Sequence, residues 1–142
     1  MLWIVMSMKW IMLVSGALTC TMLYAAIAPQ AALQGTFGET LDGPVANIVV
    51  RNWGVLIGLM GAMLIYGAFN PVVRSLVLIV AGISKVAFIA LILSVGWQFL
   101  EYQAGIAVVS DVIQVSLFIG YLLASAKNGK ASDRRSPMRV SS

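Results

Sequence analysis

The sequence predicts an all-α protein, an integral membrane four-helix bundle with both termini in the cytoplasm. Its 142 residues are 61% hydrophobic and only 10% charged. A soluble domain carries about 25% charged residues, so this chain lacks the polar groups to cover a globule in water. Its long apolar stretches are therefore expected to face lipid.

The length of these stretches indicates helices. A helix needs ~20 apolar residues to cross the hydrocarbon core, whereas barrel strands alternate apolar and polar residues over ~10 positions. The apolar runs here are continuous. The predicted helices cover residues 10–28, 48–69, 75–97 and 104–126. Together they predict one transmembrane domain over residues 1–126, followed by a basic, disordered cytoplasmic tail over residues 127–142.

The first predicted helix follows Lys9, and Met1, Met6 and Met8 all remain possible starts. The segment also has features of a signal peptide, because a lysine precedes an apolar run and small residues over 25–28. Pro29 stands directly after the only suitable cleavage site and disfavours cutting there. We therefore expect an uncleaved first helix; cleavage would leave three spans in the same orientation.

The longest connection, residues 29–47, lies between the first and second predicted helices. Pro29 suits the first turn of a short helix, and residues 31–33 are compatible with one. We expect a short interfacial helix followed by an irregular loop, in which Phe37 and Leu41 reach into the interface. A plain connector and a loop that gates a cavity are both compatible with this pattern.

Small residues recur every four positions in two predicted helices and indicate close helix packing. The predicted packing residues are Gly54, Gly58 and Ala62 in the second helix, and Ser116, Gly120 and Ala124 in the fourth. We expect intramolecular packing, with self-association through such a face as the alternative.

Basic residues set the predicted orientation. Lys9, Arg74 and the basic residues after 126 fall on one side of the predicted bundle, whereas Glu39 and Glu101 fall on the other. Flanks rich in Lys and Arg stay in the cytoplasm. The net charge of +4 is therefore attributed to topology rather than to a nucleic-acid partner. The predicted location is the bacterial inner membrane, with the lipid bilayer as a partner.

Three charged residues lie within the predicted spans. At ~1.5 Å per residue, Lys85 lies ~16 Å from the cytoplasmic end of its helix, near the midplane. Asp111 and Arg51 lie ~10 Å and ~6 Å below the outer ends of theirs. An unpaired charge at a helix centre costs ~2.5–3.5 kcal/mol, so these groups are expected to pair inside the bundle.

We therefore predict one polar pocket with Lys85 and Asp111 as partners and Arg51 close enough to compete for the carboxylate. The pocket is further predicted to include the hydrogen-bonding side chains of Ser84, Ser110 and Gln114. It serves either as an internal ion network or as a ligand site. Two cations against one carboxylate would favour an anionic ligand.

Two absences argue against most enzyme classes. The chain has no histidine, which removes imidazole metal ligation and histidine general-base catalysis, and its single cysteine, Cys20, cannot form an internal disulfide. We predict no metal, no cofactor and no catalytic residues.

The arrangement of Lys9 before the first helix, Pro29 after it, and the VVRNWG sequence that opens the second helix resembles small bacterial four-helix membrane proteins of the DoxX-like type. Arg51, Trp53 and Gly54 are the most specific part of this resemblance, which spans most of residues 9–126. The resemblance implies an inner-membrane four-helix bundle, and some family members are membrane subunits linked to quinone redox chemistry. Small multidrug transporters are set aside because they need an acidic residue in the first helix.

The sequence thus predicts an accessory subunit or a bundle that binds a small ligand or lipid. The alternative is a small transporter or channel for an anionic or lipid-like substrate, using the pocket of Arg51, Lys85 and Asp111. An accessory subunit would bind another membrane subunit, and a transporter would self-associate.

Overall fold

The computed structural model describes residues 2–133, and these residues form helices joined by short turns, without a strand. The elements in chain order are α1 (Leu2–Cys20), the 3₁₀ turn η1 (Thr21–Leu23), α2 (Tyr24–Ile27), α3 (Pro29–Phe37), α4 (Pro44–Phe69), α5 (Pro71–Val95), the 3₁₀ turn η2 (Trp97–Glu101) and α6 (Gln103–Asp133). Within the described range, four segments are long and apolar enough to cross a membrane: Met6–Ile27, Pro44–Phe69, Pro71–Val95 and Gln103–Lys130. The predicted helical class and the four candidate spans are confirmed.

Several helix boundaries differ from the prediction, most strongly near the two ends of the chain: α4 and α5 each begin four residues earlier than predicted, at Pro44 and Pro71. The first helix begins at Leu2 rather than at residue 10, and α6 continues to Asp133 rather than ending at residue 126. The part of the predicted disordered tail that follows residue 126 therefore begins as helix. Lysine and alanine in this stretch are good helix formers, whereas Asn128 and Gly129 are poor ones, so the stretch is helical as a continuation of the long apolar helix before it. Residues 134–142 of the predicted tail lie outside the described range.

Proline marks the starts of three helices. The first turns of α3, α4 and α5 contain Pro29, Pro44 and Pro71, respectively. Proline is suited to this position because its fixed φ matches the helix and its missing N–H would have no partner there. Asn70 caps α5, its side-chain oxygen accepting a 3.2 Å hydrogen bond from the backbone N–H of Val72. A single residue thus joins α4 to α5 and makes them antiparallel neighbours.

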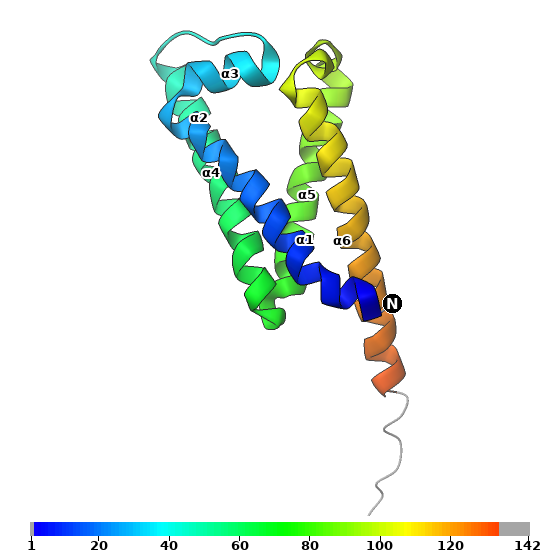
Figure 1. Ribbon diagram of the computed structural model, residues 1–142. Coiled ribbons are helices and arrows are strands. Elements are labelled where there is room, and N and C mark those ends of the chain that lie inside the picture. The colour runs from blue at the N-terminus through cyan, green and yellow to red at the C-terminus, as the bar shows by residue number, and fades with distance from the viewer. Residues whose placement is uncertain (1, 134–142) are drawn as a thin grey trace, which may run out of the picture.

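The helices form two pairs, which Figure 1 shows approaching each other at one end and diverging at the other. One pair consists of α4 packed against α1, η1 and α2, and the other consists of α5 and α6. The pairs meet at the end where Asn70 joins α4 to α5, here called the turn end. They diverge toward the end that α3 covers, here called the α3 end (Figure 1).

The main hydrophobic core fills the turn end. All four long helices contribute to this cluster, which contains Met8, Met12, Leu64, Ala68, Val77, Leu78, Ala81, Phe118 and Tyr121. Since lipid tails are as apolar as these side chains, close van der Waals packing holds the helices together here. Nearer the α3 end, a smaller cluster of Ile92, Ala104 and Val108 joins α5 to α6, and side chains of α3 and η2 pack against it.

Glycines bring α1 and α4 into close contact. A Cβ atom at position 61 would lie 2.7 Å from the backbone nitrogen of Cys20 and 2.7 Å from the carbonyl oxygen of Gly16. Gly54 and Gly58 are also buried, whereas Ala62 is exposed. Ala62 therefore takes no part in packing within the chain, contrary to the expectation, while self-association through this face stays a prediction. Residues i, i+4 and i+7 share one helix face, whereas residue i+8 is turned by about 80° from it.

The predicted ridge on α6 is likewise corrected. Ser116 is exposed, and a Cβ atom at Gly120 would meet no atom within 4 Å, whereas Ala124 is buried. The buried stripe of α6 runs through Val108, Gln114, Phe118 and Tyr121. Ser116 lies two residues from both Gln114 and Phe118, which places it on the opposite side of the helix.

Helix α3 connects the two pairs at their open end. The ring of Phe37 lies 6.1 Å from that of Trp53 on α4 and 5.4 Å from that of Phe99 in η2. Gly38 ends α3 in the left-handed conformation (φ 73°), and a Cβ there would overlap the ring of Tyr102. The short helix predicted after Pro29 is present, and it extends from Pro29 to Phe37.

Candidate functional site

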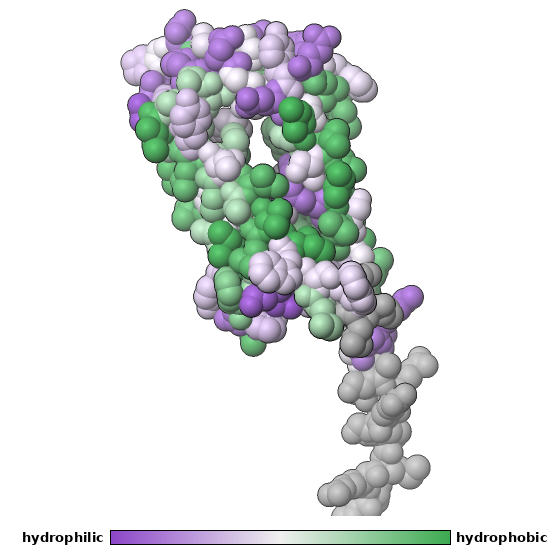
Figure 2. Space-filling model, viewed as in Figure 1, coloured by the Kyte–Doolittle hydropathy of each residue, from purple (hydrophilic) through white to green (hydrophobic). Residues whose placement is uncertain are grey.

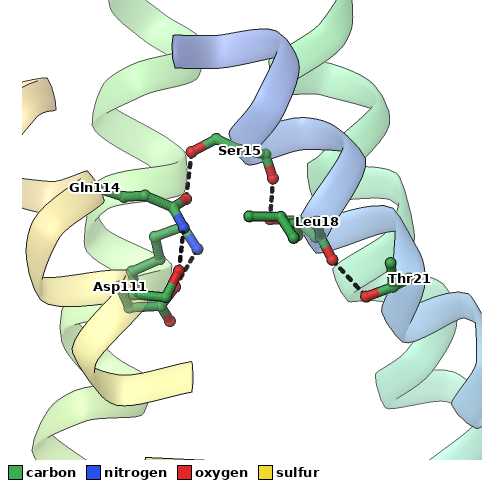
Figure 3. A network of polar contacts seen from close by, with 8 residues as sticks. Ser15, Leu18, Thr21, Asp111 and Gln114 are labelled. Atoms are coloured by element: carbon green, nitrogen blue, oxygen red, sulfur yellow. Dashed lines mark hydrogen bonds and ion pairs between the residues drawn. The ribbon is translucent and has the colours of Figure 1, made fainter. Parts of the chain in front are cut away.

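An ion pair joins α5 to α6 inside the apolar part of the fold. The ammonium group of Lys85 donates to Oδ1 of Asp111, and the two side chains are only 11% and 15% exposed. The sequence predicted this pair from the similar depth of the two residues on consecutive helices. In Figure 3 the carboxylate of Asp111 points toward the space between the helices.

A series of side-chain hydrogen bonds joins α6 to α1. Ser15 Oγ donates to Oε1 of Gln114, whose Nε2 in turn donates to Ser110 Oγ at 2.9 Å (Figure 3). Ser15 is 1% exposed and Gln114 is 8% exposed. A buried amide without partners would be costly, and these bonds satisfy both ends of the Gln114 side chain. This series therefore links the two helix pairs across their interior.

Sequence reasoning missed Ser15, because a serine in an apolar helix is a weak signal. The spacing of Ser15 from the preceding methionines would have indicated that its side chain is buried. Met8, Met12 and Ser15 follow the spacing of one helix face, and the first two are fully buried in the main core. A serine on that face must find a partner inside the bundle.

Arg51 lies outside this network, contrary to the prediction. Its Nε donates to Oδ1 of Asn47 at 2.7 Å, and its Nη1 donates to the carbonyl oxygen of Ala26 at 2.6 Å. Ala26 is in the last turn of α2, where carbonyls lack helical partners and attract a cation. Arg51 therefore caps a neighbouring helix.

Ser84 is also outside the network. It directly precedes Lys85 in sequence, but its side chain is exposed, because adjacent residues point ~100° apart around a helix. The polar cluster consequently contains Ser15, Lys85, Ser110, Asp111 and Gln114. It holds one cation and one carboxylate, so the excess positive charge expected from Arg51 is absent.

Arg74 is a buried cation whose role the sequence did not reveal. It is 9% exposed, and its guanidinium donates to the carbonyl oxygens of Gly67 (3.2 Å) and Ala68 (2.9 Å) at the end of α4. Arg51 and Arg74 thus have the same role at opposite ends of the fold. Each one satisfies carbonyls at the C-terminus of another helix.

Two cavities open between the helix pairs at the α3 end, and Figure 2 shows the molecule hollowed in this region, with hydrophilic residues on the wall. The larger has a volume of about 480 Å³ and lies between η1, α2, α3 and the start of α6. Its polar lining consists of the uncharged side chains of Thr21, Tyr24, Thr36 and Gln103. We call it the front cavity.

The second cavity is a shallow, open groove with a volume of about 280 Å³ and an apolar wall. Its aromatic lining comes from Phe37, Trp53, Phe88 and Phe99, which lie on α3, α4, α5 and η2. Leu91, Ile92, Val95 and Gly96 complete it. We call it the aromatic cavity. The whole space between the two helix pairs, from α3 toward the turn end, is called the hollow.

The ion pair lies deeper than the linings of both cavities: on α5, Lys85 is three residues, or ~4.5 Å, deeper than Phe88 of the aromatic cavity, and on α6 the difference is larger. Asp111 is eight residues past Gln103, which is ~12 Å farther from the α3 end, and Gln114 is another ~4–5 Å deeper. Beyond Gln114 the main core of the turn end closes the space between the helices. The polar cluster therefore lies between the two cavities and the main core, without lining either cavity, and we refer to it as the floor of the hollow.

The fold and this site define the class: an all-helical chain with four candidate membrane-spanning helices, as in a small multi-pass membrane protein. Comparisons with protein-family models, curated proteins and solved structures find no match. Within residues 2–133, no group of three or more His, Cys, Asp or Glu side chains is placed to hold a metal ion.

Proposed function

We propose that this protein is a small multi-pass protein of the bacterial inner membrane that binds a lipid-like molecule in the hollow between its helix pairs. One observation carries the proposal: the front cavity, about 480 Å³ in volume, has both polar and apolar walls. Ligand sites in proteins typically combine ~300–1,000 Å³ of mostly apolar wall with a few polar groups. Kinship with DoxX-like four-helix proteins stays a prediction.

The distribution of charge supports an orientation with both termini in the cytoplasm. Lys9, Arg74 and Lys127 belong to the turn end, whereas Glu39, Asp42 and Glu101 are in the α3-end connections. By the positive-inside rule the turn end faces the cytoplasm. The hollow would then open toward the outer leaflet.

The ligand would enter from the side or from the α3 end. The main core at the turn end is fully packed, and Met8, Met12, Leu64 and Phe118 are each at most 1% exposed. A molecule in the hollow therefore has no path through that end in this conformation. This closure favours a binding protein over an open channel.

A transporter is the second candidate, and the ion pair at the floor favours it. Ionisable side chains inside membrane spans often mark transport paths. Transbilayer movement of a fluorescent lipid in liposomes separates the two roles. A binding protein leaves the rate at the level of protein-free liposomes, whereas a transporter raises it.

Blocking the front cavity tests the proposed function. Ala31 is exposed on α3 and lines this cavity, so Ala31→Trp should fill it. Ala62→Trp is the matched control, because Ala62 is exposed on α4 and lines neither cavity. We expect native mass spectrometry to show bound lipid on the parent and on Ala62→Trp, and less on Ala31→Trp. Equal lipid on all three variants would contradict the proposal.

A further inference from the structure

We infer that the ligand of the hollow is an uncharged amphiphile, with a hydroxyl or carbonyl group at its polar end and a hydrocarbon chain or ring at the other. This inference rests on the proposed function and specifies the chemistry of the ligand. It replaces the anionic ligand that the sequence suggested.

The floor of the hollow carries no net charge. Lys85 and Asp111 neutralise each other, and Arg51 is bound to Ala26 and Asn47 at the α3 end. An anionic group could reach Lys85 only by competing with Asp111, which would leave that carboxylate without its partner. A cationic group would displace Lys85 in the same way. Either exchange leaves an uncompensated charge inside the membrane span, which is costly.

The polar groups around the hollow are suited to hydroxyl and carbonyl ligands. Thr21, Tyr24, Thr36 and Gln103 line the front cavity, and none of them carries a charge. Hydroxyl side chains both donate and accept hydrogen bonds, and the amide of Gln103 offers one group of each kind. Within the described residues, neither cavity wall includes a charged side chain.

The aromatic cavity accounts for the apolar part of the ligand. Its wall offers four aromatic rings, and the indole N–H of Trp53 is the one polar side-chain group among its lining residues, so a polar group placed there would lose most of its hydrogen bonds. Phe37 lies at the border between the cavities, beside Thr36 of the front cavity. In the inferred arrangement, one molecule places its polar end in the front cavity and its hydrocarbon in the aromatic one.

Three probes with the same hydrocarbon chain test the inference: monoolein, which is uncharged, oleate, which is anionic, and oleylammonium, which is cationic. Each is titrated into the detergent-purified protein in an uncharged detergent, at a pH where both charged probes are ionised, and the melting temperature is followed. The Ala31→Trp variant provides the background, which matters for oleate because the chain carries a net charge of +4.

We expect monoolein to raise the melting temperature of the parent with an apparent affinity at least about tenfold tighter than either charged probe. Ala31→Trp should abolish this response. A response to oleate or oleylammonium that equals that to monoolein and is lost in Ala31→Trp would overturn the inference while leaving the proposed function in place. The absence of any response sensitive to Ala31→Trp would overturn both.

Discussion

Arg51 of α4 and Ala26 of α2 are joined by a 2.6 Å hydrogen bond from the guanidinium to the backbone carbonyl oxygen. This contact holds the arginine at the α3 end and away from Asp111. As a result the ion pair of Lys85 and Asp111 is electrically balanced. The net charge at the floor of the hollow therefore depends on which groups Arg51 contacts.

Replacing this arginine should affect stability but not ligand preference. Arg51→Gln removes the charged cap on α2, and we expect a loss of about 1 kcal/mol in the free energy of unfolding. The relative affinities for monoolein and oleate should stay those of the parent. Thermal melting with each probe measures both quantities. A changed preference would show that the Arg51 charge reaches the hollow.

The ion pair should contribute to stability as a unit. Lys85→Met and Asp111→Asn each leave one charge without a partner, and we expect each to destabilise the protein by about 2–4 kcal/mol. The double variant should recover most of this loss, because it leaves no charge behind. Melting temperatures of all four proteins close the double-mutant cycle. Purely additive effects would mean that the two side chains do not stabilise each other.

The contact between α1 and α4 should depend on one particular glycine. Gly61→Val places side-chain atoms against the backbones of Cys20 and Gly16, and we expect a loss of about 1–3 kcal/mol or more. The neighbouring change Ala62→Val should stay within about 0.5 kcal/mol, because Ala62 is exposed. Denaturation of both variants in one detergent gives the comparison. A similar loss in both would refute the assigned packing face.

The sequence allowed prediction of the features that composition and depth control. A chain this apolar has few alternatives to long helices, and its four uninterrupted runs define the four candidate spans. Lys85 and Asp111 were paired correctly because they are at similar depths on consecutive helices and each needs a partner there. Pro29 correctly indicated the start of α3.

The remaining features depend on which way a side chain points and on backbone groups that no sequence pattern displays. Arg51 is at nearly the depth of Asp111, but the unpaired carbonyl of Ala26 lies closer to it. That carbonyl is available because α2 ends before Pro29 and α4 passes beside it. The hollow itself arises because the helix pairs diverge, with Phe37 bridging them at the α3 end.

The charge preference of the Asp111→Asn variant tests the central claim most directly. This substitution leaves Lys85 without its carboxylate and makes the floor of the hollow positive. If the balanced ion pair selects uncharged ligands, the preference should shift from monoolein toward oleate in Asp111→Asn. It should return to monoolein in the double variant with Lys85→Met. An unchanged preference for monoolein in Asp111→Asn would contradict the account, because the charge at the floor would then have no part in choosing the ligand.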